Sequence, residues 1–325
     1  MVLVNFRLAL HPVHPGPAWL EWLFAALEGK ASATFVVLAG LGLALATRAQ
    51  APIAARYWTT RRALFLLPIG LLNMLVFPAD IIHYYAFYFL LALPWLQSGK
   101  RALCLGILSL AGLSNWALLN FDYGAGWDWT TLQYADLWTA NGFFRNTFFN
   151  GFHPVLPWLA LLLYGMLLAH LPLQHVRTQW ALAATGLSMA GAAFLLAWLG
   201  QDSQWSWLLG TGPLPPGPGY LLLGMGSAST VISACLLIER HWPNGPWTWM
   251  LPAGRMTLSL YLAHIFIGMG LLEEVGALNG TWSLQEAALA ACAFLAAATP
   301  AAWLWALWKP QGPVESLMRR LTAQR

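Results

Sequence analysis

Long apolar runs dominate the pattern of hydrophobic and polar positions along the chain. Runs of about 18 residues or more recur over its whole length, which is the signature of membrane-spanning helices rather than of one buried core. They predict a short first stretch at 1–10 and nine further helices, at 32–47, 63–79, 81–97, 102–121, 153–171, 179–199, 219–238, 256–272 and 284–308. The pattern therefore predicts an all-α, polytopic transmembrane bundle of about ten helices, in a single domain over residues 1–325.

The first stretch is too short to cross a bilayer. Ten helical residues rise only about 15 Å, whereas the hydrocarbon core is about 30 Å thick. We therefore expect either that the true start lies upstream of Met1 or that the first helix is incomplete. A signal peptide is a poor fit, because no basic region precedes the apolar stretch and no A-x-A site follows it.

Two segments outside these runs also carry structural signals. Segment 17–28 has apolar residues at helical spacing with Glu21 and Glu28 on the remaining face. This predicts an interfacial helix, with a second membrane crossing as the alternative. The connection 122–152 is rich in Trp, Tyr, Phe and Asn. A connection of that length is typical of a lid or binding element, and an interfacial segment held by its aromatic residues is an equal alternative.

The chain carries few charges for its 325 residues. Its 16 Lys and Arg with 12 Asp and Glu make 9%, against about 25% in soluble domains, which excludes a normal water-facing surface and makes the lipid bilayer the expected partner. The net charge is +4, but the cations cluster between apolar runs and set topology, so nucleic acid is not expected as a partner. Three cysteines in apolar stretches without C-x-x-C spacing predict neither a disulfide framework nor a metal site.

The charged residues also predict how the chain is oriented. If every run crosses once, one side receives most of the cations, namely Arg48, Arg56, Arg61, Arg62, Lys100, Arg101, Arg177, Arg240, Arg255, Lys309, Arg319, Arg320 and Arg325. The other side receives mostly acids, namely Asp80, Asp122, Asp128, Asp136, Asp202, Glu273 and Glu274. By the positive-inside rule the first side and both termini are cytoplasmic, and the connection 122–152 is external.

Polar side chains at membrane depth are costly, so the few present are the best guides to function. His11 and His14 follow the first apolar stretch. Histidine exchanges a proton near neutral pH, as a general base must, although a solvated turn is the simpler interpretation. Asp80 and His83 are three residues apart at the start of the fourth run. There the carboxylate could orient the imidazole, or Asp80 could simply cap the helix, and the two roles are compatible.

Two further groups lie at the ends of later runs. His153 follows Arg145, Asn146 and Asn150 in a segment broken by Gly and Pro. Such a break allows a polar, substrate-binding pocket near the interface, and a structural histidine is as probable an interpretation. Arg255 precedes a run that holds Thr257, Ser259, Tyr261 and His264. The cation could meet a phosphate, whereas Thr257 and Ser259 are better interpreted as contacts between helices.

Several enzyme and transporter classes have motifs that this chain lacks. It contains no G-x-x-x-x-G-K-[ST], no G-x-G-x-x-G after a strand, no H-E-x-x-H and no G-x-S-x-G. An ATP-driven pump, a Rossmann enzyme, a zinc protease of this type and an α/β-hydrolase are therefore disfavoured.

Pieces of the sequence, in order, resemble a family of bacterial integral-membrane proteins, the YeiB-like/DUF418 proteins, and the related catalytic domain of heparan-α-glucosaminide N-acetyltransferases. The matching pieces are MVLVNF at 1–6, EGKASATFVVLAGLGLAL at 28–45, RRALFLLPIGLLN at 61–73, ADIIHYYA at 79–86, GFHPVLPWLALLLYGMLL at 151–168, GRMTLSLYLAH at 254–264 and GPVESLMRRLT at 312–322. The chain departs from the family pattern in lacking a D-x-x-R-G-x-A-L segment before MVLVNF and in carrying Ala79 for a Gly and Asn73 for a frequent His.

The resemblance implies a transmembrane acyltransferase of the bacterial cytoplasmic (inner) membrane. Such a protein would move an acyl group, in the first place acetyl, from cytoplasmic acyl-CoA to a sugar or similar acceptor on the outer side. The acetyltransferases keep an acyl-handling histidine shortly after their first transmembrane helix, and His11 and His14 occupy that place here. No metal cofactor is implied, and homodimerisation is left open.

Two other kinds of function compete with acyl transfer. For the enzyme, Arg61, Arg62, Arg101 and Arg255 are available to hold the phosphates of CoA. A permease for a small solute or lipid-linked sugar would use the same polar residues, but no internal repeat supports it. A noncatalytic membrane partner protein is the third alternative. Turnover of the acyl-CoA thioester would separate the first function from the other two.

Overall fold

The computed structural model describes residues 1–12 and 14–322. A helix occupies each of the ten positions at which the apolar runs predict one, so the predicted all-α architecture is confirmed. A single two-stranded sheet is present among the described residues. Arg325, one of the cations counted for orientation, lies outside the described part of the chain.

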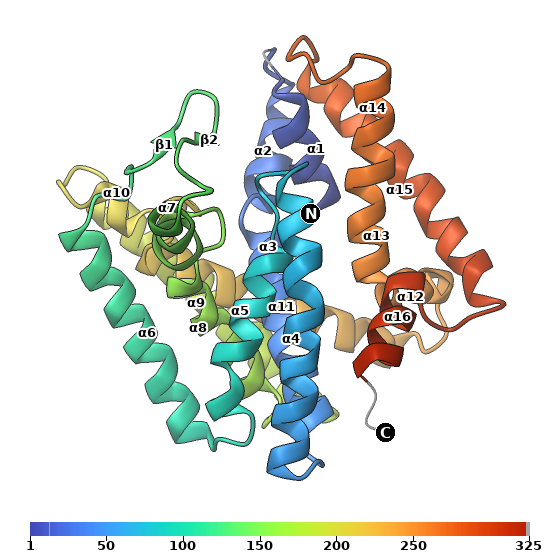
Figure 1. The fold of residues 1–325 in the computed structure, drawn as a ribbon. Helices are drawn as coiled ribbons and strands as arrows, with labels where there is room; N and C mark the ends of the chain where they lie inside the picture. Colours follow the sequence, from blue (N-terminus) through green and yellow to red (C-terminus); the bar gives the residue numbers. More distant parts are fainter. Residues whose placement is uncertain (13, 323–325) are drawn as a thin grey trace. The chain divides into compact units, whose positions relative to one another are not determined.

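The chain forms two compact units, which we call the end unit and the central unit. The end unit combines Met1–Glu28 with the segment from Trp242 onward, and the central unit is Gly29–His241. The end unit contains α1 (Val2–Leu10), α2 (Ala18–Leu27), η3 (Pro246–Met250), α12 (Leu251–Arg255), α13 (Thr257–Ala263), η4 (His264–Met269), α14 (Gly270–Glu274), α15 (Leu284–Ala306) and α16 (Pro313–Thr322) (Figure 1). The central unit contains α3 (Lys30–Thr47), α4 (Pro52–Met74), α5 (Ile82–Leu91), η1 (Leu93–Trp95), α6 (Lys100–Asn120), β1 (Trp127–Asp128), β2 (Gln133–Tyr134), α7 (Ala140–Arg145), η2 (Asn146–Asn150), α8 (Val155–Leu168), α9 (Val176–Gly200), α10 (Ser206–Leu209) and α11 (Pro218–His241).

Several helices are long and apolar enough to cross a membrane. Among the described residues, five helical stretches meet this condition: Ala18–Thr47, Lys100–Asn120, Val176–Gly200, Pro218–His241 and Leu284–Ala306. The number rises to seven if two bent pairs, Ala140–Asn150 with Val155–Leu168 and Pro246–Arg255 with Thr257–Glu274, each form one span. Large apolar side chains such as Leu105 and Leu199 are about two-thirds exposed, at 65% and 66%. Because lipid is as apolar as these side chains, such faces suit a bilayer, and the chain is a multi-pass membrane protein.

Helix α8 is the core of the central unit. Almost all of its side chains are buried, and it packs against α3, α5, α6 and α11. Its contact with α3 is so close that a Cβ added at Gly40 would lie 2.0 Å from the carbonyl oxygen of Leu162. A Cβ at Gly165 would lie 1.9 Å from the carbonyl oxygen of Val37. Small residues on facing helices let the two backbones approach in this way, which fixes the position of α8 and of the polar residues at its start.

In the end unit, helix α1 packs against α15. The carboxylates of Glu286 and Glu315 stabilise the first turns of two helices there. Ser283 and Glu286 form a capping box at the start of α15, with the Ser283 N–H donating to Glu286 Oε2 at 2.7 Å. Glu315, on the C-terminal helix α16, accepts hydrogen bonds from the backbone N–H groups of Leu258 and Ser259 at 2.7 and 2.9 Å. Its carboxylate also accepts from the Ser259 hydroxyl. A carboxylate at a helix N-terminus is favoured by the helix dipole, so Glu315 ties α16 to α13.

Several predicted boundaries were wrong. The predicted loop 48–62 is mostly helical, because α4 begins at Pro52, a residue favoured at the first position of a helix. The predicted helix 81–97 ends early, since α5 stops at Leu91 and a 3₁₀ turn containing Pro94 follows. The predicted loop 122–152 is helical from Ala140 onward. Segment 17–28 does form a helix, α2, but it belongs to the 30-residue apolar stretch Ala18–Thr47.

Candidate active site

Asp80 and His83 form a buried pair at the start of α5. Neither side chain is exposed to solvent, and His83 Nδ1 lies 3.0 Å from Asp80 Oδ2. The same oxygen accepts the backbone N–H of His83 at 2.9 Å, and Asp80 Oδ1 accepts from Nδ2 of Asn73 at 2.7 Å. Asp80 therefore holds both the first turn of α5 and the imidazole, so the two roles expected for it occur together.

The pair determines which nitrogen of His83 carries a proton. Both oxygens of Asp80 already accept hydrogen bonds from N–H groups, so we assign the proton of its contact with the imidazole to Nδ1 of His83. In the neutral ring Nε2 then has a free lone pair. Nε2 is buried and has no hydrogen-bond partner among the described residues. A buried imidazole that is oriented by a carboxylate and has a free nitrogen can act as a general base.

Close packing of α4 against α5 holds this pair in place. A Cβ added at Gly70 of α4 would lie 2.2 Å from the backbone nitrogen of His83. Only glycine allows α4 to pass the first turn of α5 at this distance. One turn further along α4, Asn73 is fully buried and reaches Asp80. The geometry of the pair is thus fixed by the close contact of Gly70 with His83 and by the hydrogen bond from Asn73 to Asp80.

A row of aromatic rings links His83 to His153. The Tyr84 ring lies 3.8 Å from the His83 ring and 5.8 Å from the His153 ring, measured between centroids. The His153 ring in turn lies 4.7 Å from the Trp158 ring, edge to face. Tyr88 donates to the carbonyl oxygen of His153 at 2.6 Å, and Tyr84 donates to Oδ1 of Asn146 at 2.9 Å. Asn146 and His153 are therefore held by Tyr84 and Tyr88, which follow His83 on α5.

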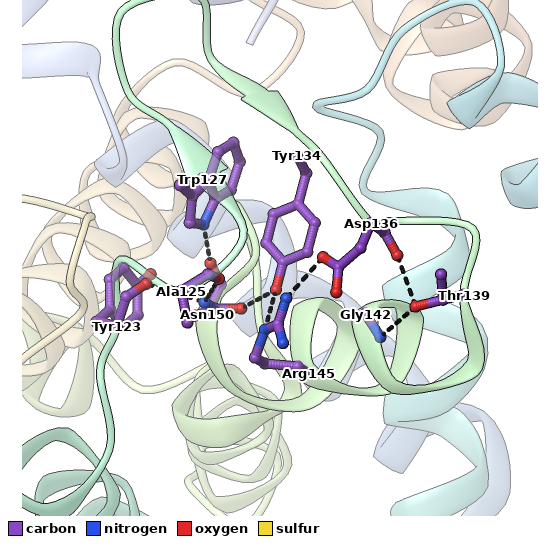
Figure 2. Close-up of polar contacts among 9 residues, drawn as sticks. All are labelled: Tyr123, Ala125, Trp127, Tyr134, Asp136, Thr139, Gly142, Arg145 and Asn150. Atoms are coloured by element: carbon purple, nitrogen blue, oxygen red, sulfur yellow. Dashed lines mark hydrogen bonds and ion pairs between the residues drawn. The ribbon is translucent and has the colours of Figure 1, made fainter.

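Asn150 organises the connection between α6 and α8 (Figure 2). Its side-chain amide donates to the carbonyl oxygens of Tyr123 and Ala125 at 2.9 and 2.8 Å and accepts from the Tyr134 hydroxyl at 2.7 Å. Its own carbonyl oxygen accepts from the Trp127 indole at 2.6 Å. Asn150 lies in η2, a π-helical segment, and such segments are frequent at functional sites. The β1–β2 hairpin is therefore fastened to the polypeptide three residues before His153.

Arg145 completes this network on the exposed side (Figure 2). Its guanidinium donates to the Tyr134 hydroxyl at 2.7 Å and forms an ion pair with Asp136 at 2.7 Å. Burial raises the pKa of the Tyr134 hydroxyl above its ordinary value, and the nearby guanidinium partly opposes this shift. The Arg145 guanidinium thus bonds to side chains of the protein itself, and its predicted substrate-binding role stays a prediction.

The two other predicted histidines lie in the end unit. His11 and His14 are exposed in the connection between α1 and α2, and the backbone of His14 pairs with Ser283. His264, at the start of the π-helical segment η4, is buried, and its Nε2 lies 2.9 Å from Nδ2 of Asn5. The pairs His11–His14 and Asp80–His83 belong to different units, and the catalytic role of each stays a prediction.

The predicted donor-binding arginines are distributed over both units. Arg61 and Arg62 lie in the middle of α4, where Arg62 stacks on the Trp58 ring at 4.5 Å from its centroid. Arg101 is exposed at the start of α6, and Arg255 is exposed at the end of α12. The Nε atom of Arg62 is buried without a hydrogen-bond partner in the described part of the chain.

Sequence reasoning missed Tyr84 and Trp158, and it noted Asn73 only as a departure from a family pattern. Tyr84 directly follows His83, but nothing in the sequence distinguishes it from Tyr85 or Tyr88. Trp158 lies in a run of apolar residues where any large side chain would be expected. The hydrogen bond from Asn73 to Asp80 spans seven residues and a non-helical turn, so helical spacing could not reveal it.

Comparison with known families places the chain in two of them. A family described as the catalytic domain of heparan-alpha-glucosaminide N-acetyltransferase matches residues 1–211, and a family described as protein of unknown function DUF418 matches residues 154–325. No curated protein and no solved structure gives a significant match. Both family matches cover more than half of the chain and include Trp158, whereas His153 lies in the acetyltransferase match alone. The chain therefore belongs to the DUF418 family and to the transmembrane acetyltransferase family defined by that catalytic domain.

Proposed function

We propose that this protein is a transmembrane acyltransferase that moves an acyl group, in the first place acetyl, from acyl-CoA to a sugar or similar acceptor. The observation that carries the proposal is the Asp80–His83 pair, in which a buried imidazole is held by a carboxylate at 3.0 Å and keeps a free Nε2. Membership of an acetyltransferase-type family supports the same chemistry. Because one fold can host several reactions, the site and not the family match carries the proposal.

In the proposed reaction Nε2 of His83 takes the proton of the acceptor hydroxyl or amine. The acceptor atom then attacks the carbonyl carbon of the thioester and forms a new bond there. The carbon–sulfur bond breaks, and CoA leaves as a thiolate that recovers the proton from the imidazolium. Asp80 stabilises that imidazolium while it exists, and Asn73 keeps the carboxylate oriented.

For the donor, we assign the CoA phosphates to cationic side chains of the central unit, Arg61, Arg62 and Arg101, on the side expected to be cytoplasmic, and Arg255 of the end unit is a separate candidate. The acceptor would approach from the opposite side, where the hairpin fastened to Asn150 and the residues Arg145 and His153 would contact it. The protein would thus lie in a bacterial cytoplasmic membrane with both termini inside, as one transmembrane acyltransferase domain.

Release of the free CoA thiol tests this proposal. Purified protein in detergent is given acetyl-CoA with glucosamine as the acceptor probe, and thiol release is followed by colour formation. We expect turnover by the wild type and a loss of about 10²- to 10⁴-fold in His83→Ala, the usual contribution of a positioned base. Absence of turnover together with absence of CoA binding in the wild type would refute the proposed function.

His11 and His14 are the competing positions for the acyl-handling histidine. The double variant His11→Ala/His14→Ala, assayed beside His83→Ala, separates the two assignments. If the base is His83, the double variant keeps its turnover within a few-fold. If the double variant loses activity while His83→Ala keeps it, the base lies in the end unit instead.

A further inference from the structure

Trp158 is a buried side chain with an unused polar atom. It is the largest fully buried side chain in the described part of the protein. Its indole nitrogen, Nε1, is buried and finds no hydrogen-bond partner among the described residues. Two other tryptophans show the usual arrangement, since Trp127 donates to the carbonyl oxygen of Asn150 at 2.6 Å and Trp305 donates to that of Gln311 at 2.9 Å.

An unpaired buried donor is unfavourable, because a buried indole N–H usually has a hydrogen-bond partner. We therefore expect the indole N–H of Trp158 to donate a hydrogen bond to a bound molecule, since no described residue accepts it. An indole nitrogen only donates, so this partner must be a hydrogen-bond acceptor such as a carbonyl oxygen or an anion.

The surroundings of Trp158 connect this donor to the proposed base. Its ring lies 4.7 Å from the His153 ring, whose Nδ1 is also buried without a partner in the described residues. On its other side the His153 ring lies 5.8 Å from the Tyr84 ring, and the Tyr84 ring lies 3.8 Å from the His83 ring, measured between centroids. The regular part of α8 begins beside Trp158, because Leu156 has non-helical backbone angles of φ −93° and ψ 114°. Trp158 is thus held at the N-terminal end of the most buried helix of the central unit.

We propose that Trp158 is a catalytic residue whose indole N–H donates to the carbonyl oxygen of the acyl thioester. This inference rests on the proposed acyl transfer. When the acceptor attacks, the π bond of the carbonyl opens and its electron pair moves onto the oxygen, which becomes an anion. A donor aimed at that oxygen stabilises the charge most strongly in the transition state, in a site from which water is excluded. When the carbon–sulfur bond breaks, the electron pair returns to re-form the carbonyl.

Removal of the indole N–H tests the proposal, in one variant with loss of ring volume and in a second that keeps the shape of the bicyclic ring. Trp158→Phe and site-specific replacement of Trp158 by 3-benzothienylalanine, in which sulfur takes the place of the N–H, are compared with the wild type using acetyl-CoA and glucosamine. We expect kcat to fall about 10²- to 10³-fold, the usual cost of losing one such donor, while KM for acetyl-CoA stays within a few-fold. Tyr164→Phe is the matched control, because it removes a buried polar group on the same helix, the hydroxyl that bonds to Ser229 at 2.7 Å. It should keep the wild-type kcat.

The outcomes are distinct. A kcat within about three-fold of the wild type in either folded Trp158 variant would overturn the proposal and leave the proposed function intact. Loss of kcat in Trp158→Phe but not in the benzothienylalanine protein would assign Trp158 a packing role and also overturn it. An inactive wild type, by contrast, would refute the proposed function itself.

Discussion

Replacement of Asp80 by Asn removes the charge from the proposed base pair with little change in shape. Oδ2 of Asp80 accepts both from the backbone N–H of His83 and from its Nδ1, at 2.9 and 3.0 Å. The backbone N–H can only donate, so the amide oxygen of an Asn must take this position. The new amide NH₂ then faces Asn73, whose Oδ1 is buried and has no partner among the described residues. A flip of the Asn73 amide turns this oxygen toward the new donor, so the variant can fold and can keep the same nitrogen of His83 protonated.

The expected loss of kcat in Asp80→Asn follows from the attraction between the carboxylate and the imidazolium. Two unit charges about 4 Å apart interact by about 4 kcal/mol at an effective dielectric constant of about 20. This attraction exists only while His83 is an imidazolium, so its loss raises the barrier and leaves the resting state nearly unchanged. A barrier higher by about 3–4 kcal/mol lowers kcat roughly 10²- to 10³-fold. The free energy of unfolding should fall by only about 1–2 kcal/mol, the difference between hydrogen bonds to charged and to neutral acceptors.

The assay measures kcat and KM for acetyl-CoA separately, together with thermal unfolding of each variant. Asp202→Asn is the control, because Asp202 is an exposed acid in the same unit and its loss should change neither constant. A folded Asp80→Asn protein with kcat within about three-fold of the wild type would refute the reasoning, since the carboxylate would then have only its helix-capping role.

Four further predictions follow from other contacts. Asn150→Ala removes three side-chain hydrogen bonds and should lower the free energy of unfolding by about 2–4 kcal/mol in denaturant melts; the control Asn120→Ala removes one exposed bond, and equal shifts in the two variants would contradict the role of Asn150. Burial raises the pKa of the Tyr134 hydroxyl, so its contribution to stability is complete below pH about 10 and is lost as the pH rises through the folded-state pKa; tryptophan fluorescence should show that Tyr134→Phe loses this alkaline dependence, and an unchanged dependence would exclude Tyr134 as its source. Glu315→Gln weakens the carboxylate contact that holds α16 on α13 by about 1–2 kcal/mol, so limited proteolysis should remove the C-terminal helix sooner, and equal rates argue against the contact. Arg62→Ala should weaken CoA binding by about 1.5–3 kcal/mol in calorimetry, whereas unchanged affinity in a folded variant would leave Arg62 a topology determinant.

The helices were predictable because their apolar runs are long, but their ends were not. Arg56, Arg61 and Arg62 made the start of α4 resemble a loop, although the helix carries them without a break. Hydropathy records the mean polarity of a segment, whereas a helix needs only a continuous hydrogen-bonded backbone. The same limit hid α7 and η2, where Arg145, Asn146 and Asn150 interrupt the apolar pattern.

Contacts of the candidate site between residues close in the sequence could be predicted, whereas contacts between distant residues could not. Asp80 and His83 are three residues apart, and that spacing predicted the contact between their side chains. The partners of Asn150 lie far from it in sequence, since Tyr134 is 16 residues and Tyr123 is 27 residues away. The unpaired N–H of Trp158 depends on what surrounds it in three dimensions, which no sequence pattern expresses.

In the proposed reaction the acyl group passes from a cytoplasmic donor to an external acceptor, and His83 is the general base. The most direct test uses proteoliposomes of defined orientation, loaded with acetyl-CoA labelled in the acetyl group and given glucosamine on the outside only. Transfer is measured by mass spectrometry of the external sugar. We predict labelled N-acetylglucosamine outside vesicles that contain the wild type, and a yield about 10²- to 10⁴-fold lower with His83→Ala. Equal labelling by the two proteins, or no labelled sugar from a wild type that binds CoA, would contradict the account.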